Sequence, residues 1–121
     1  MGASNGVDQA QVYVTGAFTG TGQSSARPVK GYYNFALWGT FVGTARLEKS
    51  YDGGTTYIPV SLDALGDPAS YTAPVSVTGF ECEAGVLYRV NCTAFTSGTI
   101  NYRVSGPEYG ANMGVPNIWG G

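Results

Sequence analysis

The chain has 121 residues, a formal net charge of −2, and charged side chains at only 12% of its positions. This length fits one domain with a single hydrophobic core. The six basic residues are scattered, which argues against nucleic-acid binding, because that requires a basic excess on one face. No apolar run reaches the length of a membrane span, and no secretory signal is expected at the N-terminus. The low charge is compatible with stable subunit contacts, since charges are costly to desolvate.

The residues needed for several kinds of chemistry are missing from the sequence. It contains no histidine, which excludes Ser-His-Asp and Cys-His triads. Its two cysteines, Cys82 and Cys92, do not supply a metal site, and no phosphate-binding loop precedes a helix. We expect both thiols to be free, because Cys82 precedes a turn and Cys92 lies mid-strand, too far apart for a disulfide. We therefore expect no cofactor and no metal, and free thiols suit a reducing cytoplasm.

Alternating apolar and polar residues predict strands throughout residues 9–106, after a flexible segment at residues 1–8. The predicted strands are 11–18, 32–38, 41–51, 55–60, 71–80, 86–94 and 99–105. Residues 62–69 are expected to form a loop with at most one helical turn. About seven short strands at this spacing predict an all-β fold, a single antiparallel β-sandwich of jelly-roll or immunoglobulin/fibronectin-like type.

Further predictions concern the pairing, burial and edge positions of individual strands. The runs at 86–94 and 99–105 flank a short Gly-containing turn, which predicts that they pair as a hairpin. The five large apolar residues of 32–38 predict a strand buried on both faces. Pro59 predicts an edge position or a bulge, and Pro74 predicts an edge position, because proline cannot donate a hydrogen bond to a neighbouring strand.

The carboxylates do not favour glycoside hydrolysis, which usually needs two of them across a cleft. Glu81 and Glu83 lie on one segment, so we expect solvated turn charges there. Cross-strand ion pairs are expected on one outer sheet face, among Arg46, Glu48, Arg89 and Arg103.

Nine tyrosines and two tryptophans could stack on sugars or fill a core. The strand positions of Tyr33, Phe35, Tyr88 and Tyr102 favour core or subunit contact over sugar binding.

The segment SYDGGTTY at residues 50–57 resembles the Asp-box hairpin of sialidase propellers. Gly53 and Gly54 supply the positive φ angles that a tight turn requires, and Asp52 can accept backbone hydrogen bonds within its own turn. Tyr51 and Tyr57 flank the turn and could pack together. The motif occurs once, so it predicts a structural hairpin and no catalytic group.

Residues 107–121 form a Gly/Pro-rich C-terminal arm without a strand period. Two interpretations are open: the arm packs over the open end of its own domain, or it docks on a neighbouring chain and becomes ordered there. The candidate partner-binding residues are its large side chains, Tyr109, Met113, Val115, Ile118 and Trp119.

Three segments, LWGTFVGTARLEKSYDGGTTYIPV, SYTAPVSV and FECEAGVLYRVNCTAFTSGTINYRVSG, follow one another over residues 37–106. This series resembles small β-sandwich structural proteins of tailed bacteriophage virions. The resemblance implies a non-enzymatic virion protein, made in the bacterial host cytoplasm. It favours a capsid decoration or cement protein on the capsid exterior that binds the major capsid protein or copies of itself.

A fibre or adaptor module of the head or tail is the alternative, with another virion protein or a host-surface glycan as its partner. A small carbohydrate-active enzyme is the least favoured hypothesis.

Overall fold

The computed structural model describes residues 11–62 and 65–107, which form strands and connecting turns and contain no helix. All strand pairs are antiparallel, so the predicted all-β class is confirmed. The strands are β1 (Gln11–Phe18), β2 (Gly22–Gln23), β3 (Arg27–Pro28), β4 (Gly31–Trp38), β5 (Phe41–Ser50), β6 (Ile58–Pro59), β7 (Ser70–Tyr71), β8 (Val75–Glu81), β9 (Leu87–Gly98) and β10 (Ile100–Pro107).

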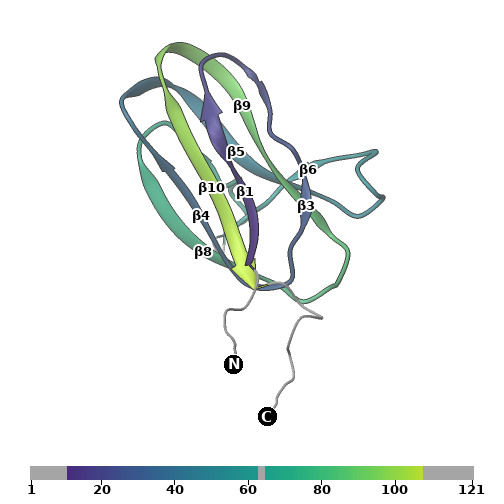
Figure 1. The fold of residues 1–121 in the computed structure, drawn as a ribbon. Helices are drawn as coiled ribbons and strands as arrows, with labels where there is room; N and C mark the ends of the chain where they lie inside the picture. Colours follow the sequence, from purple (N-terminus) through teal and green to yellow (C-terminus); the bar gives the residue numbers. More distant parts are fainter. Residues whose placement is uncertain (1–10, 63–64, 108–121) are drawn as a thin grey trace.

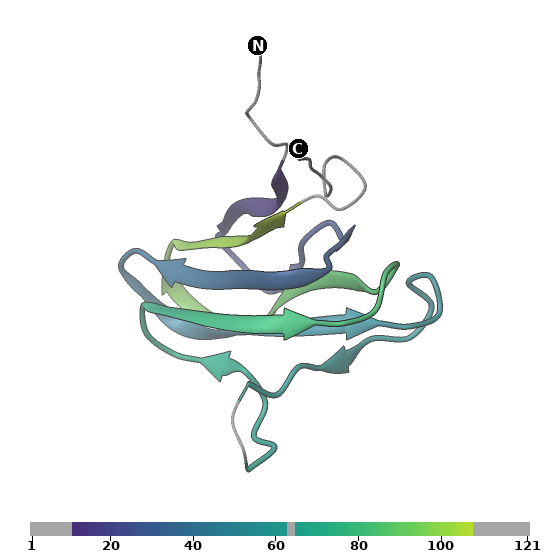
Figure 2. The same ribbon diagram turned by 90° about the horizontal axis from the view of Figure 1, so that it is seen from below.

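The strands form two sheets, which lie against each other as in a sandwich (Figures 1 and 2). The first sheet has the order β1-β10-β4-β8. The second has the order β2-β9-β5-β6, with β3 also paired to β9 and β7 also paired to β5. The inward side chains of both sheets fill one core, which includes Phe35, Leu47 and Val90, all fully buried.

The alternation of side chains in the sequence is reproduced in the strands that fill this core. In β5, the alternate residues Ala45 and Leu47 point inward and are fully buried. In β4, the inward Phe35 is fully buried, but the outward Tyr32 is 70% exposed. The prediction that this strand is buried on both faces is therefore wrong. Its outer face is apolar in composition, yet no described element covers it.

The predicted hairpin of residues 86–94 with 99–105 is also wrong. β9 pairs with β5, whereas β10 pairs with β1 and β4 in the other sheet. The chain changes sheet at Gly98, which has φ +90°, and the next N–H, from Thr99, donates to the Thr40 carbonyl at 3.0 Å. A strand that buries one face fits either sheet of a sandwich, so alternation alone did not distinguish a hairpin from a crossover.

The predicted strand at 71–80 is two strands in different sheets, β7 in the second and β8 in the first. Pro74 lies in the connection that crosses between the sheets. Pro59 lies in β6 at the edge of its sheet, as predicted.

The predicted number of about seven strands is not confirmed, because six long strands are accompanied by four of two residues each. The short strands β2 and β3 lie in the Gly- and Pro-containing segment after β1, where no alternating run was present to predict them.

The crossover at Gly98 makes a specific stability prediction. A Cβ added to Gly98 would collide with the backbone of Thr40 and lie 2.7 Å from the Phe41 Cα, at a φ that L-residues rarely adopt. We expect Gly98→Ala to lower the free energy of unfolding by about 3 kcal/mol in urea denaturation. Gly66 has φ +80° with nothing within 4 Å of an added Cβ, so Gly66→Ala should cost only about 1 kcal/mol. Equal losses in both variants would contradict the steric account.

Candidate functional site

The segment SYDGGTTY forms the connection between β5 and β6, which pair through Glu48 with Pro59 and Lys49 with Ile58. Ser50 Oγ accepts the Gly54 N–H at 2.9 Å and donates to Asp52 Oδ1 at 2.7 Å. Asp52 Oδ1 also accepts the Thr56 N–H at 2.8 Å, and Gly53 has φ +75°. The carboxylate therefore holds the backbone of its own turn.

These hydrogen bonds determine the acidity of Asp52. The Thr56 N–H and the Ser50 hydroxyl lower its pKa to about 2, because both stabilise the charged form. The flanking rings contact cations: Lys49 Nζ lies 5.1 Å from the centre of the Tyr51 ring, and Arg89 Cζ lies 3.6 Å from that of Tyr57. Through the contact of Tyr57 with Arg89, the turn therefore packs against the outer face of the second sheet.

That outer face carries a buried carboxylate, Glu48, which is only 2% exposed. It accepts hydrogen bonds from Arg46 Nε at 2.7 Å, Arg89 Nε at 2.9 Å and Asn91 Nδ2 at 2.9 Å. Burial opposes the charged form, but the hydrogen bonds from Asn91, Arg46 and Arg89 outweigh it and lower the pKa of Glu48. The predicted ion pairs among Arg46, Glu48 and Arg89 are present.

Arg103 does not belong to this cluster, contrary to the prediction. It lies on β10 in the first sheet, where its Cζ is 4.4 Å from the centre of the Tyr13 ring. The error follows from the wrong hairpin, because pairing β10 with β9 would have placed Arg103 beside Arg89.

A second buried carboxylate, Glu81, lies at the end of β8 and is 4% exposed. It accepts hydrogen bonds from the Tyr88 hydroxyl at 2.7 Å, the Glu83 N–H at 3.1 Å and Lys49 Nζ at 3.2 Å. The prediction of a solvated turn charge is wrong for Glu81. Its side chain points inward, where two strands of the other sheet provide a hydroxyl and an ammonium.

The chemistry open to these carboxylates is limited by their partners. Burial opposes the charge on Glu81, yet the hydrogen bonds from Tyr88, Glu83 and Lys49 lower the pKa of this group. A general acid at neutral pH needs a raised pKa, which is the opposite direction. The neighbouring Tyr88 pKa is raised by burial and by its bond to Glu81, so the hydroxyl stays protonated. The hydrogen bonds and ion pairs of Glu48 and Glu81 therefore serve to connect strands to one another.

The outer face of the first sheet is different in composition, because its exposed side chains are aromatic, amide and hydroxyl groups. Tyr32 and Phe80 are paired across β4 and β8 with ring centres 4.7 Å apart. Arg103 is the one charged residue among the outward positions whose side chains are described on these four strands. We call this surface the aromatic face; it comprises Tyr13, Tyr32, Asn34, Trp38, Ser76, Thr78, Phe80, Asn101 and Arg103.

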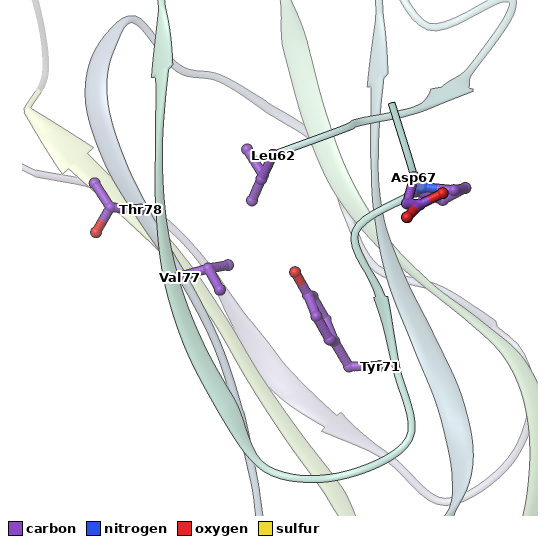
Figure 3. A pocket seen from close by; sticks show the side chains of 6 residues that line it. Leu62, Asp67, Tyr71, Val77 and Thr78 are labelled. Atoms are coloured by element: carbon purple, nitrogen blue, oxygen red, sulfur yellow. The ribbon is translucent and has the colours of Figure 1, made fainter. Parts of the chain in front are cut away.

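A hollow of about 550 Å³ lies beside the free edge of β8. It is lined by Leu62, Asp67, Pro68, Tyr71, Val77 and Thr78. Figure 3 shows that the Tyr71 side chain reaches into this hollow from one side and Val77 borders it from the other. Neither Glu48 nor Glu81 lines it, so the hollow is separate from the buried carboxylates.

The sequence-predicted partner-binding residues Tyr109, Met113, Val115, Ile118 and Trp119 lie outside the described residues. Cys82 and Cys92 are both free, as expected. Within residues 11–62 and 65–107, no group of three or more His, Cys, Asp or Glu side chains could hold a metal ion. The same residues contain no helix that could span a membrane.

Sequence reasoning placed the core tyrosines correctly, since Tyr33, Tyr88 and Tyr102 are buried. It missed the aromatic face. The signal that could have found it was the alternate set in residues 32–38, where Tyr32 and Trp38 fall opposite to the core residues. Comparison with family models, curated proteins and solved structures gave no match for this chain.

The turn makes a pH-dependent prediction. The pKa of Asp52 is about 2 in the folded chain and 3.8 ordinarily, so its stabilising contribution is complete above pH 4 and is lost as pH falls through 2. We expect Asp52→Ala to lower the melting temperature at pH 7, and this difference from the wild type to shrink between pH 4 and pH 2. Thermal melts followed by circular dichroism check this. A difference that stays constant down to pH 2 would contradict the role assigned to the carboxylate.

The buried carboxylate of Glu81 makes a second prediction. Glu81→Gln removes the charge that holds Lys49 and the Tyr88 hydroxyl, and should lower the free energy of unfolding by about 2 kcal/mol. Glu83 is exposed and contributes its backbone N–H to the cluster, so Glu83→Gln should change stability by less than about 0.5 kcal/mol. Denaturant titration of both variants checks this. Equal stability of the two variants would refute the stabilising role of the Glu81 carboxylate between the sheets.

Proposed function

We propose that the protein is a non-enzymatic structural component of a tailed-phage virion, in which it decorates the capsid by binding across major capsid protein subunits. The observation that carries the proposal is the aromatic face. It is a sheet surface with exposed rings and a single charged side chain, which matches the depletion of charge at the centre of protein interfaces. The resemblance of residues 37–106 to virion β-sandwich proteins supports the choice of partner.

The strand order supports a jelly-roll form of the sandwich as part of this proposal. β2 and β3 both pair with β9, and β6 and β7 both pair with β5, so each couple acts as one interrupted strand. Counted this way, the chain has eight strands, numbered 1 to 8 in chain order: β1, β2 with β3, β4, β5, β6 with β7, β8, β9 and β10. In these numbers the strand order is 1-8-3-6 in the first sheet and 2-7-4-5 in the second. This is the order of a double-sheet jelly roll, an architecture used by viral capsid and lectin domains.

The buried carboxylates support the non-enzymatic part of the proposal. Glu48 and Glu81 have lowered pKa values, and their oxygens are occupied by cations, an amide, a hydroxyl and a backbone N–H. Neither is placed as a general acid, and neither borders the hollow beside β8.

The C-terminal arm is proposed as a second anchor on the capsid, with Ile118 and Trp119 as its main contacts. Its attachment point is next to the aromatic face, because Gly106 lies beside Tyr32: a Cβ added to Gly106 would be 3.0 Å from the Tyr32 carbonyl. A chain that ends at Pro107 measures the contribution of the arm to capsid binding.

The test is the occupancy of purified capsids by added protein, measured by quantitative mass spectrometry against the major capsid protein. Replacement of both Tyr32 and Phe80 by serine should weaken binding at least tenfold, since buried aromatic side chains usually dominate interface energy (about 2 kcal/mol or more each). Tyr51→Ser, which removes an exposed ring from the turn after β5, should leave occupancy unchanged. The proposal is refuted by absence of the wild-type chain from intact particles.

A second candidate function is a fibre or adaptor module that binds a host-surface glycan. The observation that favours it is the placement of exposed rings beside the Asn34 amide and the Ser76 hydroxyl, which hydrogen-bond to each other at 3.2 Å. Aromatic faces and amide or hydroxyl groups together suit sugar rings. Binding to a glycan array by the free protein, lost when Trp38 is replaced by alanine, would favour this candidate over decoration.

A further inference from the structure

The two sheets protect their edges differently. The second sheet ends in the two-residue strands β2 and β3 on one side and β6 and β7 on the other, and these contain Pro28 and Pro59. Short strands and proline are the usual devices that prevent pairing with another chain. The first sheet ends in β1, of eight residues, and β8, of seven, and neither contains proline, lysine or arginine. Its edges therefore lack this protection.

Of these two long edges, β8 is the more accessible. β1 pairs with β10 and also contacts β3 and β9 of the other sheet. The only strand with which β8 makes extensive contact, among those described, is β4. Within residues 11–62 and 65–107, no strand pairs with the other side of β8, and Leu62 packs against the core side of the strand at Gly79.

The hollow beside β8 lies where such a strand would place its inward side chains. Alternate residues of an added strand point to the core side of the sheet, which is the side of Val77. There Leu62, Tyr71 and Val77 provide an apolar lining. A backbone edge next to an apolar hollow is the arrangement used in strand addition.

We propose that the occupant is a second copy of this chain, with the two β8 strands paired antiparallel about a two-fold axis at Thr78. The two four-stranded sheets then form one continuous sheet. In this register Ser76 lies opposite the partner's Phe80, and Val77 lies opposite the partner's Gly79, which has no side chain. A two-fold contact requires a self-complementary surface, and β8 meets this requirement.

The charges of β8 allow this pairing. Glu81 is the one ionisable residue of the strand, it lies at the end, and its carboxylate is already bound by Lys49 and Tyr88. In the antiparallel register it faces the partner's Val75, so no like charges meet across the axis. The dimer requires only a second copy, so it goes beyond the proposed capsid role and does not depend on it.

The test is the mass of the full-length protein in solution, measured by light scattering during size-exclusion chromatography at about 100 µM and on dilution. We expect a dimer, at twice the chain mass of 12.6 kDa. Thr78→Lys places two ammonium groups opposite each other at the axis, and should raise the dimer dissociation constant by at least about tenfold. Ala17→Lys adds the same charge to the exposed outer side of β1, and should leave the dimer intact.

Four results would overturn the proposal. The first three are a monomeric wild type at the highest concentration, a dimer unaffected by Thr78→Lys, and a dimer lost in Ala17→Lys. The fourth is a monomeric chain that ends at Pro107, which we expect to remain dimeric, because a monomer there would assign the contact to the C-terminal arm. Circular dichroism melts of each variant establish that the domain is folded. Slower hydrogen exchange of the β8 amides in the wild type than in Thr78→Lys is the expected second readout.

Discussion

The structure depends on pairing between strands that are far apart in the sequence. β1 pairs with β10 from Gln11–Pro107 to Phe18–Ile100, so the first and last strands are neighbours. β5 pairs with β9, and β4 with β8, across shorter but still non-local separations of 37 to 57 residues. The core closes only when these pairs have formed, because the chain crosses to the other sheet after β1, β3, β4, β7, β8 and β9. Folds dominated by such non-local contacts form slowly, since loop closure precedes the gain from burial.

The sequence predicted the local part of this arrangement well. Alternation identified the inward side of β5 through Leu47 and that of β9 through Tyr88 and Val90, because one buried face imposes a period of two. It did not predict the sheet to which each strand belongs. Gly98 could have closed a hairpin as readily as a crossover, and the choice is made by the tertiary contact of its neighbour Thr99 with the Thr40 carbonyl.

The polar residues show the same contrast between local features, which the sequence predicts, and long-range contacts, which it does not. The turn of Asp52 is local and was predictable, whereas the burial of Glu48 and Glu81 depends on partners from distant strands. Tyr88 lies only seven residues after Glu81, but it and Lys49 both reach Glu81 from the opposite sheet, so the cluster depends on how the two sheets pack. These buried charges are used to connect strands. The surface proposed for recognition is the outer side of the first sheet, where Arg103 is the one charged residue among the described side chains, with the edge of β8 beside it.

The central claim is that the aromatic face is the surface through which the protein contacts a virion. Hydroxyl-radical footprinting of the free and the particle-bound protein tests it most directly, because side-chain oxidation reports the exposure of individual aromatic rings. We expect that oxidation of Tyr32, Trp38 and Phe80 falls on the particle while that of Tyr51 stays at its free value. Protection of Tyr51, with the other three rings oxidised as in the free protein, would show that the aromatic face is not the contact surface.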